Sequence, residues 1–264
     1  MEGKTVVVTG GNAGIGLETA RALAALGARV VLAVRDEAKG RAAAHDIKGR
    51  VEVAKLDLAD LDDVRRFARE APPVDVLVNN AGLHTARFAR TRQGFEETFG
   101  VNHLAHFLLT RELIARHPPA RVVTVASQAH VGARVDWDDL QGERRWSGLR
   151  AYANSKLLNL WFARELARRR PDIVSVAVHP GSVRTGWARG RESGVFRIGV
   201  ALASPFLLSP AQGARTSVFC ATSPDVRSGG YYVRQRLAEP SALARDDAQA
   251  AKLWNVSERL ISQT

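Results

Sequence analysis

The amino-acid sequence predicts an α/β fold, with one parallel sheet and helices on both of its faces. Seven runs rich in β-branched residues alternate with segments whose apolar residues recur at helical spacing, which is typical of parallel sheets. A glycine-rich turn at residues 10–16 follows the first run. The chain has 264 residues, which suits one large domain with a substantial core, so we expect residues 1–264 to form a single domain.

The predicted strands are short, and most of them are apolar throughout, as strands buried on both faces are. They are expected at residues 4–9, 28–34, 51–56, 74–78, 121–126, 173–178 and 230–233. Helical spacing predicts helices at residues 17–27, 38–47, 95–116, 152–169, 210–221 and 242–261. Asp60 or Asp62 is expected to cap one more helix. The interval 128–151 is predicted to be a loop with short irregular structure.

The turn after the first strand carries Gly10, Gly14 and Gly16, in the spacing G-x-x-x-G-x-G. A glycine-rich turn between a strand and a helix lets the backbone approach a pyrophosphate, and the helix N-terminus offers free N–H groups to it. The context therefore predicts a dinucleotide cofactor.

Two residues at the end of the second predicted strand indicate different forms of that cofactor. Arg35 could pair with a 2′-phosphate, whereas Asp36 could hold a free 2′-hydroxyl. Asp36 could instead cap the helix that follows.

Polar residues mark further strand ends. Asn80 and Gly82 follow the fourth predicted strand, where they suit either a ligand-facing turn or a structural one.

Tyr152 and Lys156 lie one helical turn apart, so the ammonium could stabilise the phenolate and lower the pKa of Tyr152. Alternatively, Tyr152 packs in the core and Lys156 is a surface charge.

Composition excludes several classes of protein. The net charge of +11 comes from scattered basic residues, which indicates a basic surface rather than a nucleic-acid site. His103 and His106 have no third ligand nearby, so we expect no metal site. The single Cys220, the lack of a membrane-spanning run and the lack of a signal peptide lead us to expect a cytoplasmic protein.

The apolar stretch 193–208 is interrupted by Gly199 and Pro205. It could form a mobile lid over a hydrophobic substrate, an interfacial membrane contact or a buried helix. We favour the first of these, a substrate lid formed by residues 186–208.

Taken in order, these motifs resemble the short-chain dehydrogenase/reductase family over nearly the whole chain. The resemblance implies a Rossmann, doubly wound sheet of seven parallel strands. It also implies a catalytic set of Asn102, Ser127, Tyr152 and Lys156. The implied cofactor contacts are Gly10, Asn12, Gly14, Ile15, Gly16, Arg35, Asp57, Leu58, Asn80, Ala81, Gly82, Tyr152, Lys156, Pro180, Gly181, Val183 and Thr185.

Within that family the chain is similar to the retinol dehydrogenase-like branch, as in the patterns Arg35-Asp36-x-x-Lys39-Gly40 and Val125-Ala126-Ser127-x-Ala129-His130. It departs in two ways. Ala126 replaces a serine that is common there, and the N-terminal membrane anchor of several members is absent, so we expect a soluble enzyme.

The resemblance implies an NADP(H)-dependent oxidoreductase that transfers hydride between nicotinamide and a hydrophobic ketone, aldehyde or alcohol. Tyr152 would exchange the proton, Ser127 would bind the carbonyl oxygen, Lys156 would hold the cofactor ribose, and Asn102 would order a water beside Lys156. Asn102 could instead be a satisfied helix residue. NAD(H) stays open as the cofactor, and a homodimer or homotetramer is expected. The alternative function is a catalytically silent NADP(H)-binding regulator.

Overall fold

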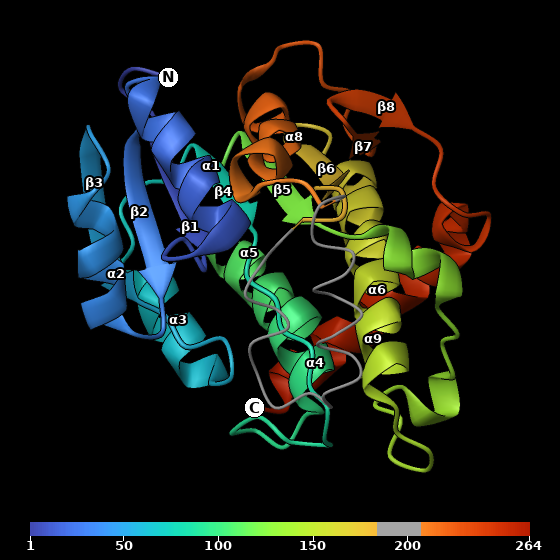
Figure 1. The fold of residues 1–264 in the computed structure, drawn as a ribbon. Coiled ribbons are helices and arrows are strands. Elements are labelled where there is room, and N and C mark those ends of the chain that lie inside the picture. The colour runs from blue at the N-terminus through green and yellow to red at the C-terminus, as the bar shows by residue number, and fades with distance from the viewer. Residues whose placement is uncertain (184–206) are drawn as a thin grey trace.

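One sheet organises the computed structural model, which describes residues 1–183 and 207–264. Its strand order is β3-β2-β1-β4-β5-β6-β7-β8, from one edge of the molecule to the other (Figure 1). Strands β1 to β7 run parallel, and β8 pairs antiparallel with β7. The bounds are β1 Thr5–Thr9, β2 Arg29–Val34, β3 Arg50–Lys55, β4 Val76–Asn79, β5 Arg121–Val125, β6 Val174–His179, β7 Tyr231–Val233 and β8 Arg236–Ala238.

Helices cover both faces of this sheet. Their bounds are α1 Gly14–Ala25, α2 Glu37–His45, α3 Leu61–Glu70, α4 Glu97–Phe99, α5 Ala105–Arg116, α6 Gly148–Arg169, α8 Pro210–Thr222 and α9 Asp247–Ser262. Helices α1, α2 and α8 pack on one face, and α3, α5 and α6 pack on the other, with α9 lying over α6. The predicted doubly wound fold is therefore confirmed.

Strand β1 shows why the central strands are apolar throughout. Val6 and Val8 join the core on the α1 side, and Val7 joins the core on the α5 side. Successive side chains of a strand point to opposite faces, so a strand covered on both faces needs apolar residues at every position.

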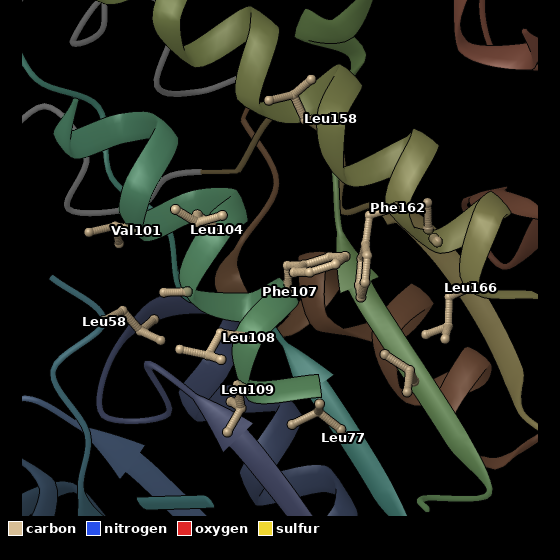
Figure 2. Packing of buried hydrophobic residues seen from close by; sticks show 14 of the residues in the cluster. Leu58, Leu77, Val101, Leu104, Phe107, Leu108, Leu109, Leu158, Phe162 and Leu166 are labelled. Carbon is tan, nitrogen blue, oxygen red and sulfur yellow. The ribbon is translucent and has the colours of Figure 1, made fainter. Parts of the chain in front are cut away.

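Aromatic packing closes the α5–α6 face. Figure 2 shows Phe107 of α5 facing Phe162 of α6, and their ring centroids lie 5.8 Å apart. Trp254 of α9 stacks on Phe162 at 6.1 Å and meets the edge of Phe107 at 4.9 Å. Helix α9 thus covers apolar surface that α5 and α6 would otherwise expose.

The helix expected at residues 95–116 is interrupted. It begins as α4 at Glu97, continues as a π-helical segment over Gly100–Leu104, and ends as α5. A methyl group added at Gly100 would lie 2.5 Å from Thr91 Cγ2, so a larger residue there would force the Thr91 side chain or the backbone to shift. Short π segments inside α-helices occur frequently at functional sites.

The expected number of strands needs a correction, because β8 is an eighth strand. It follows a two-residue turn in which Arg234 and Gln235 have φ values of 50° and 63°. Such turns usually carry asparagine or glycine, which tolerate positive φ. This turn carries neither, so the sequence gives no hairpin signal there.

Two further expectations concern a cap for α3 and a lid at residues 186–208. Of the two predicted caps of α3, Asp60 is the one that caps the helix, and its carboxylate accepts a hydrogen bond from the Asp62 N–H. The stretch 186–208, expected to form a lid, lies outside the described residues except for its last two. Within residues 1–183 and 207–264, no helix is long and apolar enough to cross a membrane.

Buried histidines make the stability of the fold depend on pH. Burial lowers the pKa of His103 to about 3 and that of His106 to about 4, from an ordinary value of 6.5. Below pH 6.5 the unfolded chain therefore binds more protons than the folded chain. The contribution of the two histidines to stability is complete above that pH and is lost as the pH falls. We expect the free energy of unfolding to drop by on the order of 1–2 kcal/mol per histidine between pH 6.5 and 5, as measured by urea denaturation.

The pH range separates this effect from that of the carboxylates whose pKa is lowered. The pKa of Asp75, for example, is lowered from an ordinary value of 3.8, which is already below this range. His103→Phe should flatten the pH dependence, whereas His45→Gln, at a side chain that is 89% exposed, should not. A free energy of unfolding that stays constant from pH 7 to 5 would contradict this prediction.

Candidate active site

The candidate residues lie at one edge of the sheet, where four of its parallel strands end. The residues that directly follow β1, β4, β5 and β6 are Gly10, Asn80, Ala126 and Pro180. The carboxyl ends of parallel strands lie at the same edge, and the strand order reverses direction between β1 and β4. Ligands of open α/β sheets bind at that reversal point.

The glycine-rich turn is shaped for close backbone approach. Gly10 and Gly14 have φ values of 65° and 56°, which favour glycine. A methyl group added at Gly16 would lie 2.4 Å from Asn80 Nδ2 and 2.5 Å from the Gly10 carbonyl oxygen. Helix α1 begins here with no side-chain cap at Ala13 and no acidic residue in its first turn, so its N–H groups suit an anion. The turn therefore fits a dinucleotide.

Thr9 ties this turn to the segment after β4. Its Oγ1 accepts hydrogen bonds from the Asn80 and Ala81 N–H groups, both at 2.9 Å. The Asn80 side chain donates back to the Thr9 carbonyl oxygen at 2.8 Å. Asn79 is buried and donates to Thr110, so its side chain has a structural partner.

His106 extends the network to Asn102. A carbonyl can only accept, so His106 Nδ1 donates to the Asn102 carbonyl oxygen at 3.2 Å. Its Nε2 must then accept the Thr9 hydroxyl proton at 2.9 Å. His103 contacts Ser257 instead, and no group of three metal-binding side chains occurs among the described residues.

Asn102 is held by protein groups on every side. Its carboxamide accepts from the Leu83 N–H at 2.8 Å and donates to the Leu83 carbonyl at 2.9 Å and to Ser155 Oγ at 3.0 Å. The Asn102 carboxamide is therefore satisfied by protein groups. A methyl group added at Gly82 would lie 3.3 Å from Lys156 Nζ and 3.5 Å from Asn102 Oδ1, so both side chains border Gly82.

Tyr152, Ser127 and Lys156 come together at the start of α6. The Tyr152 and Ser127 side chains are hydrogen-bonded to each other. Lys156 is 3% exposed, its Nζ lies 5.4 Å from the centre of the Tyr152 ring, and it donates to the Val125 carbonyl at 3.1 Å. Lys156 is therefore not a surface charge.

The predicted lowering of the Tyr152 pKa is wrong for the protein alone. Burial raises the pKa of Tyr152 to about 12, and the hydrogen bond from Ser127 only partly opposes that shift. Burial also lowers the pKa of Lys156 to about 8. Desolvation penalises the charged form of each side chain, and it is the largest cause of both shifts.

The end of β2 settles how Asp36 is used. Its carboxylate accepts from the Lys39 N–H at 3.1 Å and pairs with Lys39 Nζ at 3.0 Å, so Asp36 caps α2. Arg35 is exposed and forms no ion pair among the described residues. Burial raises the pKa of the neighbouring Glu97, while Arg35 opposes this shift and Asp57 adds to it.

Ile15 and Val183 meet at helix α8. A methyl group added at Gly213 would lie 2.6 Å from Val183 Cγ2 and 3.3 Å from Ile15 Cγ1. Val183 also forms a parallel bridge with Leu208. The segment after β6 and the glycine-rich turn thus lie against the same point of α8.

The remaining predicted cofactor residues are less closely defined. Asn12, Pro180 and Gly181 are half-buried. Leu58 is 7% exposed and lies near Leu108 in the core, so only its backbone could face a ligand (Figure 2). Thr185 lies outside the described residues.

Comparison with known proteins decides the family. A family model described as short chain dehydrogenase matches residues 4–194. The chain belongs to the short-chain dehydrogenase/reductase family. That family's fold implies a nicotinamide cofactor and an oxidoreductase acting on an alcohol or carbonyl group.

Relatives place the chain among the retinol dehydrogenase-like members of the family. Retinol dehydrogenase 12 of Mus musculus is 44% identical, covering 98% of this chain and 86% of that protein. A candidate daunorubicin C-13 ketoreductase of Streptomyces sp. (strain C5) is 40% identical, covering 100% and 94%. The crystal structure of an uncharacterized protein from Mycobacterium paratuberculosis is 40% identical, covering 98% and 93%, with a TM-score of 0.84.

The close approach at Gly16 can be tested by substitution. In Gly16→Ala the new methyl group meets backbone as well as the Asn80 side chain, so neither neighbour can move aside easily. We expect a loss of about 1–3 kcal/mol in stability and weaker cofactor binding, measured by thermal denaturation and by fluorescence titration with NADH and NADPH.

Gly132→Ala is the matched control, because nothing lies within 4 Å of the position of its added methyl group. Equal melting temperatures for Gly16→Ala and Gly132→Ala would show that the turn is not packed as described.

Proposed function

We propose that this protein is an NADP(H)-dependent oxidoreductase that reversibly transfers hydride between nicotinamide and a hydrophobic ketone, aldehyde or alcohol. The observation that carries the proposal is the Tyr152–Ser127 hydrogen bond beside the buried Lys156 ammonium. These residues lie at the sheet edge that also carries the glycine-rich turn. Acid/base and cofactor-binding groups thus share one place.

The chain's own residues would handle the proton while the cofactor, when bound, supplies or accepts the hydride. In the reducing direction, the Ser127 hydroxyl would donate to the substrate carbonyl oxygen and stabilise the charge that develops there. Tyr152 would give its proton to the same oxygen. The high pKa of Tyr152 keeps it protonated before the reaction, and the phenolate left afterwards would lie beside Lys156.

Two observations support NADP(H) over NAD(H). The Asp36 carboxylate is engaged by Lys39 and by the N-terminus of α2, so it is poorly placed to accept from a ribose hydroxyl. Arg35 is exposed at the carboxyl end of β2, and a guanidinium suits a 2′-phosphate.

Exposed apolar side chains support a hydrophobic substrate. Phe88, Val131 and Leu149 are 38%, 59% and 67% exposed. Val131 follows Ser127 closely in the chain, and Leu149 lies on the first turn of α6, before Tyr152. Relatives named for retinol and for daunorubicin C-13 fit this choice.

Tyr152→Phe tests the proton-transfer role. We expect kcat with NADPH to fall by roughly 10²–10⁴-fold, because the variant keeps the ring but has no proton to give. Cofactor affinity should change little. The measurement is NADPH oxidation at 340 nm over a panel of apolar ketones and aldehydes.

Tyr231→Phe is the matched control, since burial also raises the pKa of Tyr231 to about 12 but its hydroxyl has no hydrogen-bond partner among the described residues. Full turnover by Tyr152→Phe would rule out the mechanism. NADPH binding without turnover by the unmodified protein would favour the silent regulator instead.

Arg35→Ala tests the cofactor preference. Loss of the charged contact to a 2′-phosphate should raise the Kd for NADPH by about 10–100-fold and leave that for NADH unchanged. Arg41→Ala is the control, because Arg41 also lies on the α2 side but pairs with Glu37. An unmodified protein that binds NADH more tightly than NADPH would overturn the preference.

A further inference from the structure

The peptide unit between Ser127 and Gln128 is held from both ends by histidine rings. The Ser127 carbonyl oxygen accepts from His130 Nδ1 at 2.7 Å, and the Gln128 N–H donates to His179 Nδ1 at 3.3 Å. One ring comes from the segment after β5 and the other from the last residue of β6. The backbone N–H of His130 also donates to the Ser127 carbonyl, at 3.1 Å, so this peptide plane has two donors at its oxygen and one acceptor at its nitrogen.

The bonding pattern assigns the protons on both rings. His130 Nδ1 must carry a proton, because its partner is a carbonyl, and His130 Nε2 must not, because it accepts from the Ser241 N–H at 3.2 Å. His179 Nδ1 accepts, so it carries none. Both rings are therefore neutral, and burial lowers the pKa of each, which favours that form.

His130 is itself firmly placed. It is 2% exposed, and its ring meets the edge of Tyr231 in β7 at 5.5 Å. It thus connects the Ser127 turn to β7 and to the segment that leads to α9. Burial lowers the pKa of His179, and electrostatic interactions with His130 and with Arg234 in the β7–β8 turn add to this shift.

These two histidine bonds hold the peptide next to the Ser127 hydroxyl, which contacts Tyr152. Ser127 has extended backbone angles, and its Oγ accepts from the Ala129 N–H at 3.2 Å. A rotation of the Ser127–Gln128 peptide would move Ala129 and shift that hydroxyl relative to Tyr152. Both histidines bind the Ser127–Gln128 peptide, so their effect on the reaction would pass through Ser127.

We propose that His130 and His179 are positioning residues that hold the Ser127–Gln128 peptide and so fix the Ser127 hydroxyl for the reaction. This inference rests on the proposed function, because it assigns Ser127 to the carbonyl oxygen. If the Ser127 hydroxyl acts mainly in the transition state, a less firmly held hydroxyl lowers kcat. The KM for the cofactor then stays nearly unchanged.

Two amide substitutions at His130 separate its two bonds. In His130→Asn the side-chain amide can reach the position of Nδ1 and keep the bond to the Ser127 carbonyl, while losing Ser241. In His130→Gln the amide can reach the position of Nε2 and keep Ser241, while the Ser127 carbonyl loses its side-chain donor and keeps the backbone N–H of residue 130. Both remove the ring, so they form a matched pair for stability.

Steady-state turnover of an apolar ketone with NADPH is the readout, with thermal denaturation to check folding. We expect His130→Gln to lower kcat about 10-fold and His130→Asn to stay within about 3-fold of the unmodified protein. In a Ser127→Ala background, His130→Gln should change kcat less than about 2-fold, because residues that act as one unit are not additive.

His179 supplies a second test if the His130 variants do not fold. His179→Asn keeps an acceptor for the Gln128 N–H and should keep kcat, whereas His179→Leu should lower it. Equal kcat values for His130→Asn and His130→Gln, or the same loss with and without Ser127, would overturn the inference alone. No turnover by the unmodified protein over the substrate panel would overturn the proposed function and this inference with it.

Discussion

The common direction of β1 to β7 is the constraint on which the rest of the structure depends. Because these strands are parallel, the residues that follow them gather at one edge although they lie far apart in the chain. Parallel strands also require helical crossovers, and those helices bury both faces of the sheet. The glycine-rich turn, Ser127 and Pro180 are neighbours for this reason alone.

Burial is the second organising influence, and it acts on titratable groups. Lys156 and Tyr152 are pushed towards their neutral forms, and so are His106 and His130. A neutral histidine offers one donor and one acceptor, which lets it join two backbone segments inside an apolar core. His106 joins Thr9 to the Asn102 carbonyl in this way. Hydrogen-bonded histidines therefore link the loops of the site to the elements behind them.

Most of the fold could be predicted because its signals are local. The strands are apolar runs, and the Asp60 cap and the turn through Gly10 to Gly16 are set by a few neighbouring residues. The π segment at Gly100–Leu104 could not be predicted, since its apolar spacing resembles that of an ordinary helix. Strand β8 escaped prediction because Arg234 and Gln235 adopt positive φ without being typical turn residues.

The sequence by itself determined the order of β1 to β7 and of the main helices between them, the family and the residue types at each strand end, because these depend on local pattern and spacing. Only the tertiary structure decided how those residues are used. Asp36 caps α2, and burial rather than Lys156 controls the pKa of Tyr152. His106 connects Thr9 to the Asn102 carbonyl through its two ring nitrogens. Each outcome depends on desolvation and on contacts between distant segments, which exist only once the chain has folded.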